Sequence, residues 1–477
     1  MTERVTIIGA GPGGYVAAVR AAQRGADVTM IEREEVGGTC LNWGCIPTKV
    51  MVTTAEMFEH FQRASDFGIK VNGSVLPDIE RLMARKEKVV QDQVNGILKL
   101  LDHHKVRCLN GAGRILGPNR VQVERKDREP EEMQWDRLIL APGSAPMTIP
   151  GLPFDGEKII SSNEVLHLSE LPESILIVGG GVIGCEFAFI LALLGSKVTL
   201  VEAMERLLPL PSVDEECSKI LQREMKKRKM QFLVNRTVTG VDEAGGKLRV
   251  NIGPSPFAAD LKEKDREPLA VEVDKVLVSV GRSPAVSDLG LERIGVKRDQ
   301  RGWIEANDRM ETGAPGVYAI GDILGPAKIM LAHVASAEGF VAALNATGGD
   351  RTMNYDAVPG AIFTMPEVAD VGLTETQARA RGYESRSDTV LFRTLGKAQV
   401  IGEIAGQAKI VSDVETGRIL GVHMIGAHAT DLIAEGILAV QTGCSVEDLS
   451  RTIHAHPTLS EVMGEAAFRA MDMPLHG

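Results

Sequence analysis

The feature that most constrains the fold is an internal repeat. VTIIGAGPGGYVAAVRAAQRGADVTMIE at 5–32 aligns with ILIVGGGVIGCEFAFILALLGSKVTLVE at 175–202. Each copy has the pattern of an apolar strand, a glycine turn, a helix and a second strand that ends in glutamate. Five residues of the first copy, Gly9, Gly11, Gly14, Gly25 and Glu32, recur 170 positions later as Gly179, Gly181, Gly184, Gly195 and Glu202. Two such units predict an α/β protein with two Rossmann-like domains.

The spacing of the glycines suits dinucleotide binding. The first glycine of each motif makes the tight turn, and the second lets the backbone approach a pyrophosphate. The third lets the helix lie close to the strand, so that its N-terminus faces the phosphates. At the tip of the second strand, Glu32 and Glu202 are placed to accept from a ribose 2′-hydroxyl and to repel a 2′-phosphate. Glycines used only for packing are the alternative, but the matching glutamates favour two bound dinucleotides.

A pair of cysteines follows the first repeat directly. GGTCLNWGCIPTK at 37–49 holds Cys40 and Cys45, whereas the remaining cysteines are isolated at 108, 185, 217 and 444. Structural zinc needs four ligands, so no metal site is predicted. A structural bridge across so short a loop would add little stability. Pro47 predicts a helix that starts near Cys45, where the helix dipole favours a thiolate. A redox-active pair is therefore the favoured interpretation.

Other glycine turns indicate which dinucleotide each repeat binds. GVYAIGDI at 316–323 ends an apolar strand with Gly321 and Asp322, whose carboxylate is suited to bind the polyol of a flavin. Because the cysteine pair also follows the first repeat, that repeat is assigned to FAD and the second to NAD. Gly143, in LILAPGSAP, is placed at the FAD site, and Gly281, in VGRSP, at the NAD site.

Composition limits the partners and the compartment. The formal net charge of −11 argues against nucleic acid and anionic membranes as general partners. The apolar stretch at 175–195 has about the length of a membrane span, but three consecutive glycines near its start argue against a continuous helix. Six cysteines in 477 residues make no disulfide scaffold, and the N-terminus lacks an apolar signal segment. We expect a cytoplasmic protein.

Taken together, these motifs resemble one enzyme family. Both glycine motifs, GGTCLNWGCIPTK, the Gly-Asp motif and HAHPTLSE at 454–461 are similar to those of the flavin-dependent pyridine nucleotide–disulfide oxidoreductases. The likeness extends from about residue 3 to about residue 470. It is strongest to the members that oxidise dihydrolipoyl groups.

The resemblance implies four segments. These are an FAD-binding domain with the redox disulfide, an NAD-binding domain, a return segment that completes the FAD site, and a C-terminal α+β interface domain. Their expected bounds are 1–150, 151–280, 281–350 and 351–477. The last segment should hold an antiparallel sheet and a helix at 430–443 that is apolar enough to pair with another subunit. A homodimer with an active site shared between its subunits would result.

The resemblance also implies roles around the flavin. Cys45 would be the thiol on the flavin side, and Cys40 would exchange with the substrate. Lys49 and Glu186 would form an ion pair beside the reactive nitrogen of the flavin.

The resemblance also implies which residues bind the sugar groups of the cofactors and which act in acid–base chemistry. Glu32 would hold the adenosine ribose of FAD, Asp322 its ribitol, and Glu202 the adenosine ribose of NAD. His456, oriented by Glu461, would take the proton of a substrate thiol. In the family this pair reaches the disulfide of the other subunit.

The implied reaction oxidises protein-bound dihydrolipoyl groups to lipoyl disulfide and passes electrons through Cys40–Cys45 and FAD to NAD⁺. The partner would be a lipoyl-bearing carrier protein or lipoyl domain. Two places depart from the residues that are usual in the family: Thr48, where serine is common, and APGS at 141–144. They leave room for a specialised enzyme whose carrier lies outside the 2-oxo-acid dehydrogenase complexes. An NADH-dependent reductase of another disulfide, and a FAD-containing binding subunit without turnover, stay open as alternatives.

Overall fold

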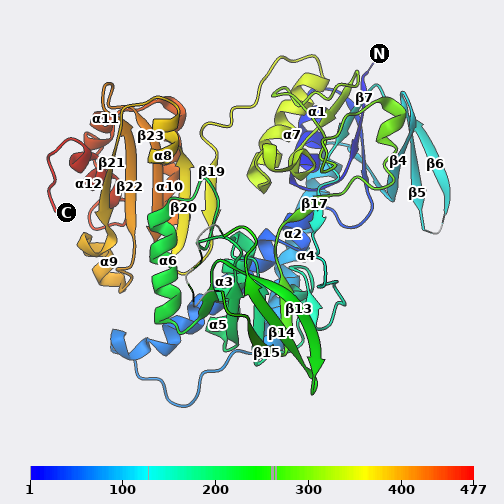
Figure 1. Ribbon diagram of the computed structural model, residues 1–477. Helices are drawn as coiled ribbons and strands as arrows, with labels where there is room; N and C mark the ends of the chain where they lie inside the picture. The colour runs from blue at the N-terminus through cyan, green and yellow to red at the C-terminus, as the bar shows by residue number, and fades with distance from the viewer. Residues whose placement is uncertain (1, 127, 259–260, 262, 264–265, 477) are drawn as a thin grey trace. The chain divides into compact units, whose positions relative to one another are not determined.

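The computed structural model describes residues 2–126, 128–258, 261, 263 and 266–476 (Figure 1). The chain divides into two compact units, each built from separated stretches of sequence. The first unit comprises Met1–Met51, Glu80–Met147 and Gly281–Asn354. The second comprises Val52–Ile79, Thr148–Val280 and Tyr355–Gly477. The four predicted domain boundaries stay predictions.

A parallel sheet of five strands forms the centre of the first unit. Its strand order is β18 (Val317–Ala319), β7 (Arg137–Leu140), β1 (Arg4–Ile8), β2 (Asp27–Glu32) and β3 (Arg107–Asn110). Apolar residues such as Ile7 and Ile139 are fully buried, as expected for a sheet covered on both faces. Helix α1 (Pro12–Gln23) connects β1 to β2 and packs against α7 (Ala332–Ala346). The first predicted strand–helix–strand unit is confirmed.

The other elements of the first unit surround that sheet. An antiparallel sheet consists of β4 (Ala112–Gly117), β5 (Arg120–Arg125) and β6 (Arg128–Gln134). A two-stranded ribbon pairs β8 (Ser144–Pro146) with β17 (Arg282–Pro284). The helical elements are α2 (Gly38–Asn42), the start of α3 (Cys45–Gln62), α4 (Ile79–His103), η4 (Leu291–Ile294) and η5 (Gly321–Ala327).

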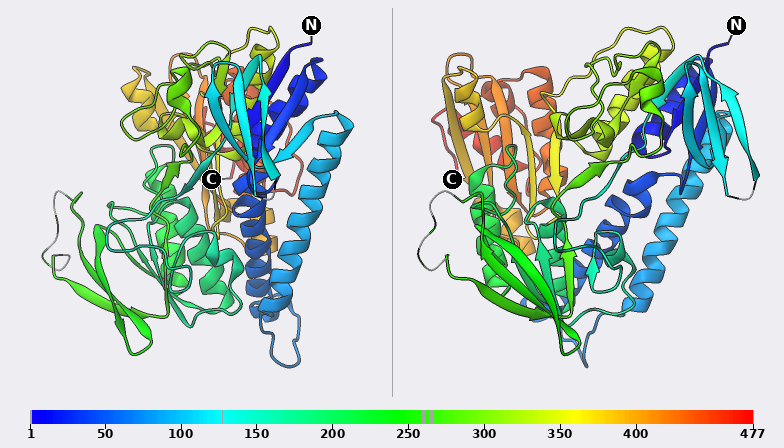
Figure 2. Two further views of the ribbon diagram at one scale, coloured as in Figure 1. Left: turned by 90° about the vertical axis from the view of Figure 1, so that its right-hand side faces the viewer. Right: turned by 45° about the vertical axis from the view of Figure 1, so that its right-hand side comes forward.

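The second unit repeats the parallel arrangement. Its five-stranded sheet has the order β12 (Gln231–Leu233), β11 (Lys197–Val201), β10 (Ser174–Val178), β16 (Lys275–Val278) and β9 (Ile159–Ile160). The helices beside it are η2 (Glu164–His167), α5 (Val182–Leu194) and α6 (Glu215–Lys227). Figure 2 shows a twisted antiparallel sheet (green), made of β13 (Arg236–Ala244), β14 (Lys247–Pro254) and β15 (Leu269–Val273).

The apolar stretch at 175–195 forms strand β10 of this sheet, a glycine turn and helix α5, as the repeat predicted. Among the described residues, no single helix is long and apolar enough to cross a membrane. The η5–α7 pair passes that test of length and composition only when the two are joined, and the pair is bent by 109°.

The C-terminal part of the second unit is an antiparallel sheet with helices. The strand order is β19 (Pro359–Ile362), β20 (Glu367–Gly372), β23 (Ile419–Gly426), β22 (Gln407–Asp413) and β21 (Ser385–Leu391). The helical elements of this part are α8 (Glu375–Ala380), η6 (Phe392–Thr394), α9 (Gly396–Ile401), α10 (Ala429–Thr442), α11 (Val446–Ser450) and α12 (Glu461–Ala470). The second unit also contains η1 (Ala64–Phe67), from the stretch Val52–Ile79. The expected antiparallel sheet and the helix near 430–443 are both confirmed.

A buried ion pair joins the two parts of this unit. Asp214 caps α6 by accepting from the backbone N–H of Glu216, with a separation of 2.9 Å. Lys409, on β22, places its Nζ 2.9 Å from Asp214 Oδ2 and 2.7 Å from Glu216 Oε2. Burial raises the pKa of Asp214, but hydrogen bonds from Lys409 and Glu216 outweigh this and leave it below its usual value. The pairing compensates a charge that would otherwise be costly to bury.

Candidate functional site

The first glycine turn leaves no room for side chains at two of its three motif positions. Gly9 has a φ of +105°, and a Cβ there would lie 2.0 Å from the carbonyl oxygen of Ala141. A Cβ on Gly14 would lie 1.9 Å from the carbonyl oxygen of Gly9. Gly11 differs, because a Cβ there would meet no atom of the described residues within 4 Å. Backbone atoms crowd the turn at Gly9 and Gly14, and the turn is open at Gly11, where a pyrophosphate would approach.

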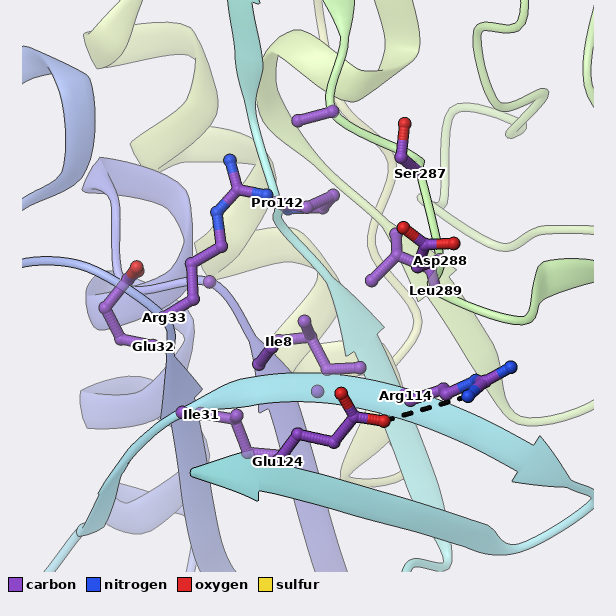
Figure 3. A pocket seen from close by; sticks show the side chains of 15 residues that line it. Ile8, Ile31, Glu32, Arg33, Arg114, Glu124, Pro142, Ser287, Asp288 and Leu289 are labelled. Carbon is purple, nitrogen blue, oxygen red and sulfur yellow. Dashed lines mark ion pairs between the residues drawn. The ribbon is translucent and has the colours of Figure 1, made fainter. Parts of the chain in front are cut away.

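Glu32 is fixed at the carboxyl end of β2. Its Oε2 accepts from the N–H of Ala10 at 2.6 Å, and its Oε1 accepts from the N–H of Glu34 at 2.9 Å. Beside it is a cavity of about 230 Å³ (Figure 3). Figure 3 shows Glu32 and Arg33 on one side and Asp288 on the other. A carboxylate held in this way beside a pocket fits the adenosine ribose of a dinucleotide.

The second glycine turn repeats this geometry. Gly179 has a φ of +102°, and a Cβ there would lie 2.5 Å from the carbonyl oxygen of Ser279. A Cβ on Gly184 would lie 1.8 Å from the carbonyl oxygen of Gly179, whereas one on Gly181 would meet no described atom within 4 Å. The residues present therefore fit a second dinucleotide.

Glu202 repeats the bonding of Glu32 in a more enclosed position. Its Oε2 accepts from the N–H of Gly180 at 2.5 Å, and its Oε1 accepts from the N–H of Met204 at 2.7 Å. It is only 6% exposed. A buried carboxylate at this position favours a ribose with a free 2′-hydroxyl.

Asp322 lies at the start of η5 and belongs to a polar network. The hydroxyl of Ser144 donates to Asp322 Oδ2 at 2.5 Å and accepts from Arg282 Nε at 2.6 Å. The Nη2 of Arg282 also donates to the carbonyl oxygen of Ser144, at 2.7 Å. Ser144 and Arg282 are not among the residues predicted from the sequence. Each directly follows a predicted cofactor-site glycine, Gly143 or Gly281, and that adjacency was the available signal.

The structure places Gly143 and Gly281 at the ends of the β8–β17 ribbon. The carbonyl oxygen of Gly143 accepts from the N–H of Ala285 at 3.1 Å, and that of Gly281 accepts from Met147 at 3.0 Å. Both glycines have positive φ, 76° and 135°. All four residues lie in the first unit. The assignment of Gly143 to FAD and of Gly281 to NAD stays a prediction.

The cysteine pair is attached directly to the first glycine turn. The N–H of Gly37 donates to the carbonyl oxygen of Ala10 at 2.8 Å, and a Cβ on Gly38 would lie 2.8 Å from the Cα of Gly11. Cys40 then lies on α2, and Cys45 is the first residue of α3. The predicted helix start at Cys45 is confirmed. A short connection thus brings two sulfurs beside the open side of a dinucleotide turn.

The two cysteines are present as thiols whose side chains are hydrogen-bonded to each other. This bond and burial raise the pKa of Cys40, while the charge of Lys49 acts against the increase. Burial also raises the pKa of Tyr15 on α1, with a smaller contribution from Cys40. The pKa of Cys40 therefore lies above that of an ordinary cysteine thiol. Sulfurs in hydrogen-bonding contact are placed to exchange between dithiol and disulfide.

Lys49 and Glu186 belong to different units. Lys49 lies on α3 one turn after Cys45, in the first unit. Glu186 lies on α5 in the second unit, is 4% exposed, and accepts from the N–H of Phe363 at 3.0 Å. Their ion pair stays a prediction.

His456 and Glu461 form the expected pair. The Nδ1 of His456 lies 2.8 Å from Glu461 Oε1, and Glu461 Oε2 accepts from the N–H of Thr458 at 2.9 Å. Burial raises the pKa of Glu461, but the hydrogen bonds from Thr458 and His456 outweigh it and leave the pKa below its usual value. His456 is 77% exposed. With Nδ1–H directed at a carboxylate, Nε2 becomes the acceptor, as a general base requires.

His454 packs differently from His456. Its Nε2 lies 3.0 Å from Glu435 Oε1, and the side chain is only 11% exposed. The ring is thus engaged within the second unit, and nothing in its contacts suggests a catalytic role.

Comparisons with known proteins agree with this geometry. Residues 3–339 match the family model described as pyridine nucleotide-disulphide oxidoreductase, and residues 358–467 match the dimerisation domain of the same family. A dihydrolipoyl dehydrogenase of Chlamydia muridarum is 40% identical over 472 residues, which cover 98% of this chain and 97% of that protein. The mitochondrial dihydrolipoyl dehydrogenase 1 of Arabidopsis thaliana is 40% identical over 475 residues, covering 99% and 91%. The C-terminal match indicates a homodimer.

Two solved structures are similar to this chain over nearly its whole length. The crystal structure of LpdA from Mycobacterium tuberculosis has a TM-score of 0.89 and 27% identity, covering 98% of this chain and 99% of that one. The HOCl-induced flavoprotein disulfide reductase RclA from Escherichia coli has a TM-score of 0.83 and 26% identity, covering 97% and 99%.

Proposed function

The chain belongs to the pyridine nucleotide-disulphide oxidoreductases, and we propose that it oxidises dihydrolipoyl groups on a carrier protein, with FAD and NAD⁺ as cofactors. The observation that supports this best is the placement of Cys40 and Cys45, in hydrogen-bonding contact and attached to the first glycine turn. Relatives at 40% identity over the full chain carry the name dihydrolipoyl dehydrogenase.

The protein and its cofactors divide the chemistry. When bound, FAD would supply the two-electron chemistry that links the cysteine pair to NAD⁺. The chain supplies the two turns that hold the dinucleotides, through Gly11 with Glu32 and Gly181 with Glu202. It also supplies the disulfide and the base.

Thiol exchange begins with proton transfer. The Nε2 of His456, from the partner subunit in this proposal, removes a proton from one dihydrolipoyl thiol, and Glu461 stabilises the imidazolium. The substrate thiolate then attacks the sulfur of Cys40 and breaks the Cys40–Cys45 disulfide. The second substrate thiol displaces Cys40 and closes the lipoyl disulfide. Two electrons have then moved to the cysteine pair.

The partner is a lipoyl-bearing carrier or lipoyl domain, and the proposed compartment is the cytoplasm. The four cysteines outside the redox pair lie at separate places in the fold, which fits a reducing environment. Thr48 and APGS at 141–144 leave room for a specialised carrier outside the 2-oxo-acid dehydrogenase complexes.

A second candidate is an NADH-dependent reductase of a different disulfide. It is favoured by the likeness to a solved structure titled a flavoprotein disulfide reductase. Such an enzyme would show poor activity with dihydrolipoamide and good NADH oxidation with another disulfide.

The decisive experiment compares two cysteine variants in the reduction of NAD⁺ by dihydrolipoamide. We expect Cys40→Ser to lower kcat at least ~100-fold, because the sulfur that accepts the substrate thiolate is gone. Cys108→Ser is the matched control, since Cys108 is an exposed residue of β3 outside the proposed site. Normal turnover by Cys40→Ser would contradict the proposed route of the electrons.

A further inference from the structure

The loop at 203–213, with the sequence AMERLLPLPSV, lies beside the second glycine turn. It begins after Glu202 and ends before Asp214, the N-cap residue of α6. Leu207 and Leu208 in this loop are fully buried. Buried leucines in a connecting segment indicate that the loop packs against the turn and has a defined conformation.

Arg206 holds this loop by hydrogen bonds to backbone carbonyl groups. Its Nη1 donates to the carbonyl oxygen of Leu208 at 2.7 Å. Its Nη2 donates to the carbonyl oxygens of Leu210 and Val213, at 2.9 and 3.1 Å. The guanidinium is planar and rigid, and hydrogen bonds from a charged donor are stronger than those from a neutral one. We call Arg206 and the three carbonyl groups the Arg206 clasp.

The clasp fixes a residue that is bonded to the second glycine turn. The N–H of Leu208 donates to the carbonyl oxygen of Gly180 at 2.7 Å. The N–H of Gly180 donates in turn to Glu202 Oε2 at 2.5 Å. The side chain of Leu207 also packs here, because a Cβ on Gly180 would lie 2.7 Å from Leu207 Cδ2. Gly180 is therefore held on one side by the carboxylate and on the other by the clasped loop.

Leu208 makes its bond to Gly180 in an unfavourable backbone conformation. Its φ is +48°, in the left-handed region that residues other than glycine rarely adopt. A leucine free of other contacts favours a negative φ, and that rotation would withdraw its N–H from Gly180. Arg206 opposes the rotation, because its Nη1 is bonded to the carbonyl group of Leu208 itself.

The first repeat makes the equivalent bond with glycine. There the N–H of Gly37 donates at 2.8 Å to the carbonyl oxygen of Ala10, which aligns with Gly180. Gly37 has a φ of +98°, a conformation that glycine adopts readily. The carbonyl groups of the residues on either side of it accept from the neutral amide of Asn42, at 3.2 and 3.0 Å. The second repeat has leucine in this role and a charged side chain to hold it.

We propose that Arg206 is a positioning residue for NAD⁺: by holding Leu208 against Gly180, it fixes the turn and the carboxylate of Glu202 that bind the adenosine half of the cofactor. The inference rests on the proposed function, because it assigns NAD⁺ to the second repeat. Arg206 acts through Leu208 and Gly180, since its guanidinium is bonded to the backbone of its own loop.

The test measures the dissociation constant of NAD⁺ with the oxidised, FAD-loaded enzyme by isothermal titration calorimetry. Protein and ligand are both oxidised, so no reaction accompanies binding. In Arg206→Met, which cannot donate to the carbonyl groups, we expect the dissociation constant to rise about tenfold, because the turn is no longer held in place. FAD content and kcat at saturating NAD⁺ should stay within about twofold of the parent, since only cofactor binding is altered.

Leu208→Gly in the Arg206→Met background is the rescue variant. Glycine adopts a positive φ without strain, so we expect the double variant to bind NAD⁺ with a dissociation constant within about threefold of the parent. A general loss of stability would not be repaired in this way, because glycine makes an unheld loop more flexible. Failure of Leu208→Gly to recover any of the lost affinity would overturn the proposal.

Arg223→Met is the matched control. Arg223 lies on α6 in the same unit, is 60% exposed, and has its Nε 3.7 Å from Glu224 Oε1. Its dissociation constant should equal that of the parent. An unchanged constant in Arg206→Met that retains FAD would overturn the proposal.

If Arg206→Met does not fold, Arg206→Lys decides. Lysine keeps the charge but lacks the planar fork that reaches three carbonyl groups, so we expect about threefold weaker binding of NAD⁺. Binding equal to that of the parent would overturn the proposal.

The binding measurement separates this inference from the proposed function. It uses no dihydrolipoamide, so a failure of that substrate would contradict the substrate and leave the NAD⁺ titration readable. Normal turnover with dihydrolipoamide, together with unchanged NAD⁺ binding in Arg206→Met, would contradict the role of Arg206 alone. A parent enzyme that binds no NAD⁺ would contradict the cofactor assignment and this inference together.

Discussion

The two repeats form the same turn and lead to different chemistry. In both copies the residue after the first glycine donates its N–H to the glutamate, at 2.6 Å from Ala10 and 2.5 Å from Gly180. The first glycine of each also donates to the strand beside it, at 2.8 Å in both cases. Backbone geometry thus defines a dinucleotide turn, and it is preserved although most of the side chains differ.

The differences lie in what surrounds each turn. The first copy is followed by α2, whose Gly38 packs on Gly11 and brings in the cysteine pair. Its helix α1 packs so closely on α7 that a Cβ on Gly339 would lie 2.3 Å from the carbonyl oxygen of Gly13. In the second copy, α5 is buried and apolar, and Cys185 replaces Tyr15. The turn determines that a dinucleotide binds, and the segment after it determines what the dinucleotide reacts with.

Substitution of the third glycine of each motif should cause the largest loss of stability, and the loss should be equal in both copies. Gly14→Ala and Gly184→Ala each place a methyl group less than 2 Å from a backbone carbonyl oxygen. Helix and strand must separate, so we expect each variant to lose several kcal/mol of unfolding free energy or to fail to fold. Urea unfolding of the purified variants measures this. A variant as stable as the parent would show that this close approach is not required.

The second glycines should separate the two sites, because their methyl groups meet no described protein atom. Gly11→Ala should fold with nearly parental stability and bind FAD roughly 10–100-fold more weakly, since the methyl group obstructs the pyrophosphate. Gly181→Ala should keep its FAD and raise the KM for NAD⁺ by a similar factor. Flavin content and KM measure the two effects. The reverse pattern would exchange the cofactor assignments of the repeats.

The glutamates should give the smallest effect. Glu202→Gln keeps the shape of the side chain but loses the charge that repels a 2′-phosphate and strengthens two backbone hydrogen bonds. We expect about a tenfold rise in the KM for NAD⁺ and a smaller preference for NAD⁺ over NADP⁺. Glu32→Gln serves as the control, because it should weaken FAD binding and leave that preference unchanged. If Glu202→Gln kept the parental preference for NAD⁺ over NADP⁺, Glu202 would have no role in that selectivity.

Local patterns in the sequence predicted much of the fold. The glycine spacing predicted both strand–helix–strand units, and Pro47 with the apolar pattern after it predicted a helix starting at Cys45. Contacts between distant segments have no such signature. The bond from Arg282 to Ser144 spans 138 residues, and that from Phe363 to Glu186 spans 177. Nothing in the sequence periodicity relates those positions, so Arg282 and Ser144 were found only in three dimensions.

In the proposed reaction, electrons enter at the cysteine pair beside the first repeat and leave at the second repeat. The most direct measurement is anaerobic reduction of the purified enzyme with one equivalent of dihydrolipoamide, followed at wavelengths beyond the flavin band. We expect new long-wavelength absorbance that disappears when NAD⁺ is added, as NADH forms. No change with dihydrolipoamide, although NADH produces the same absorbance, would contradict the substrate and direct the search to another disulfide.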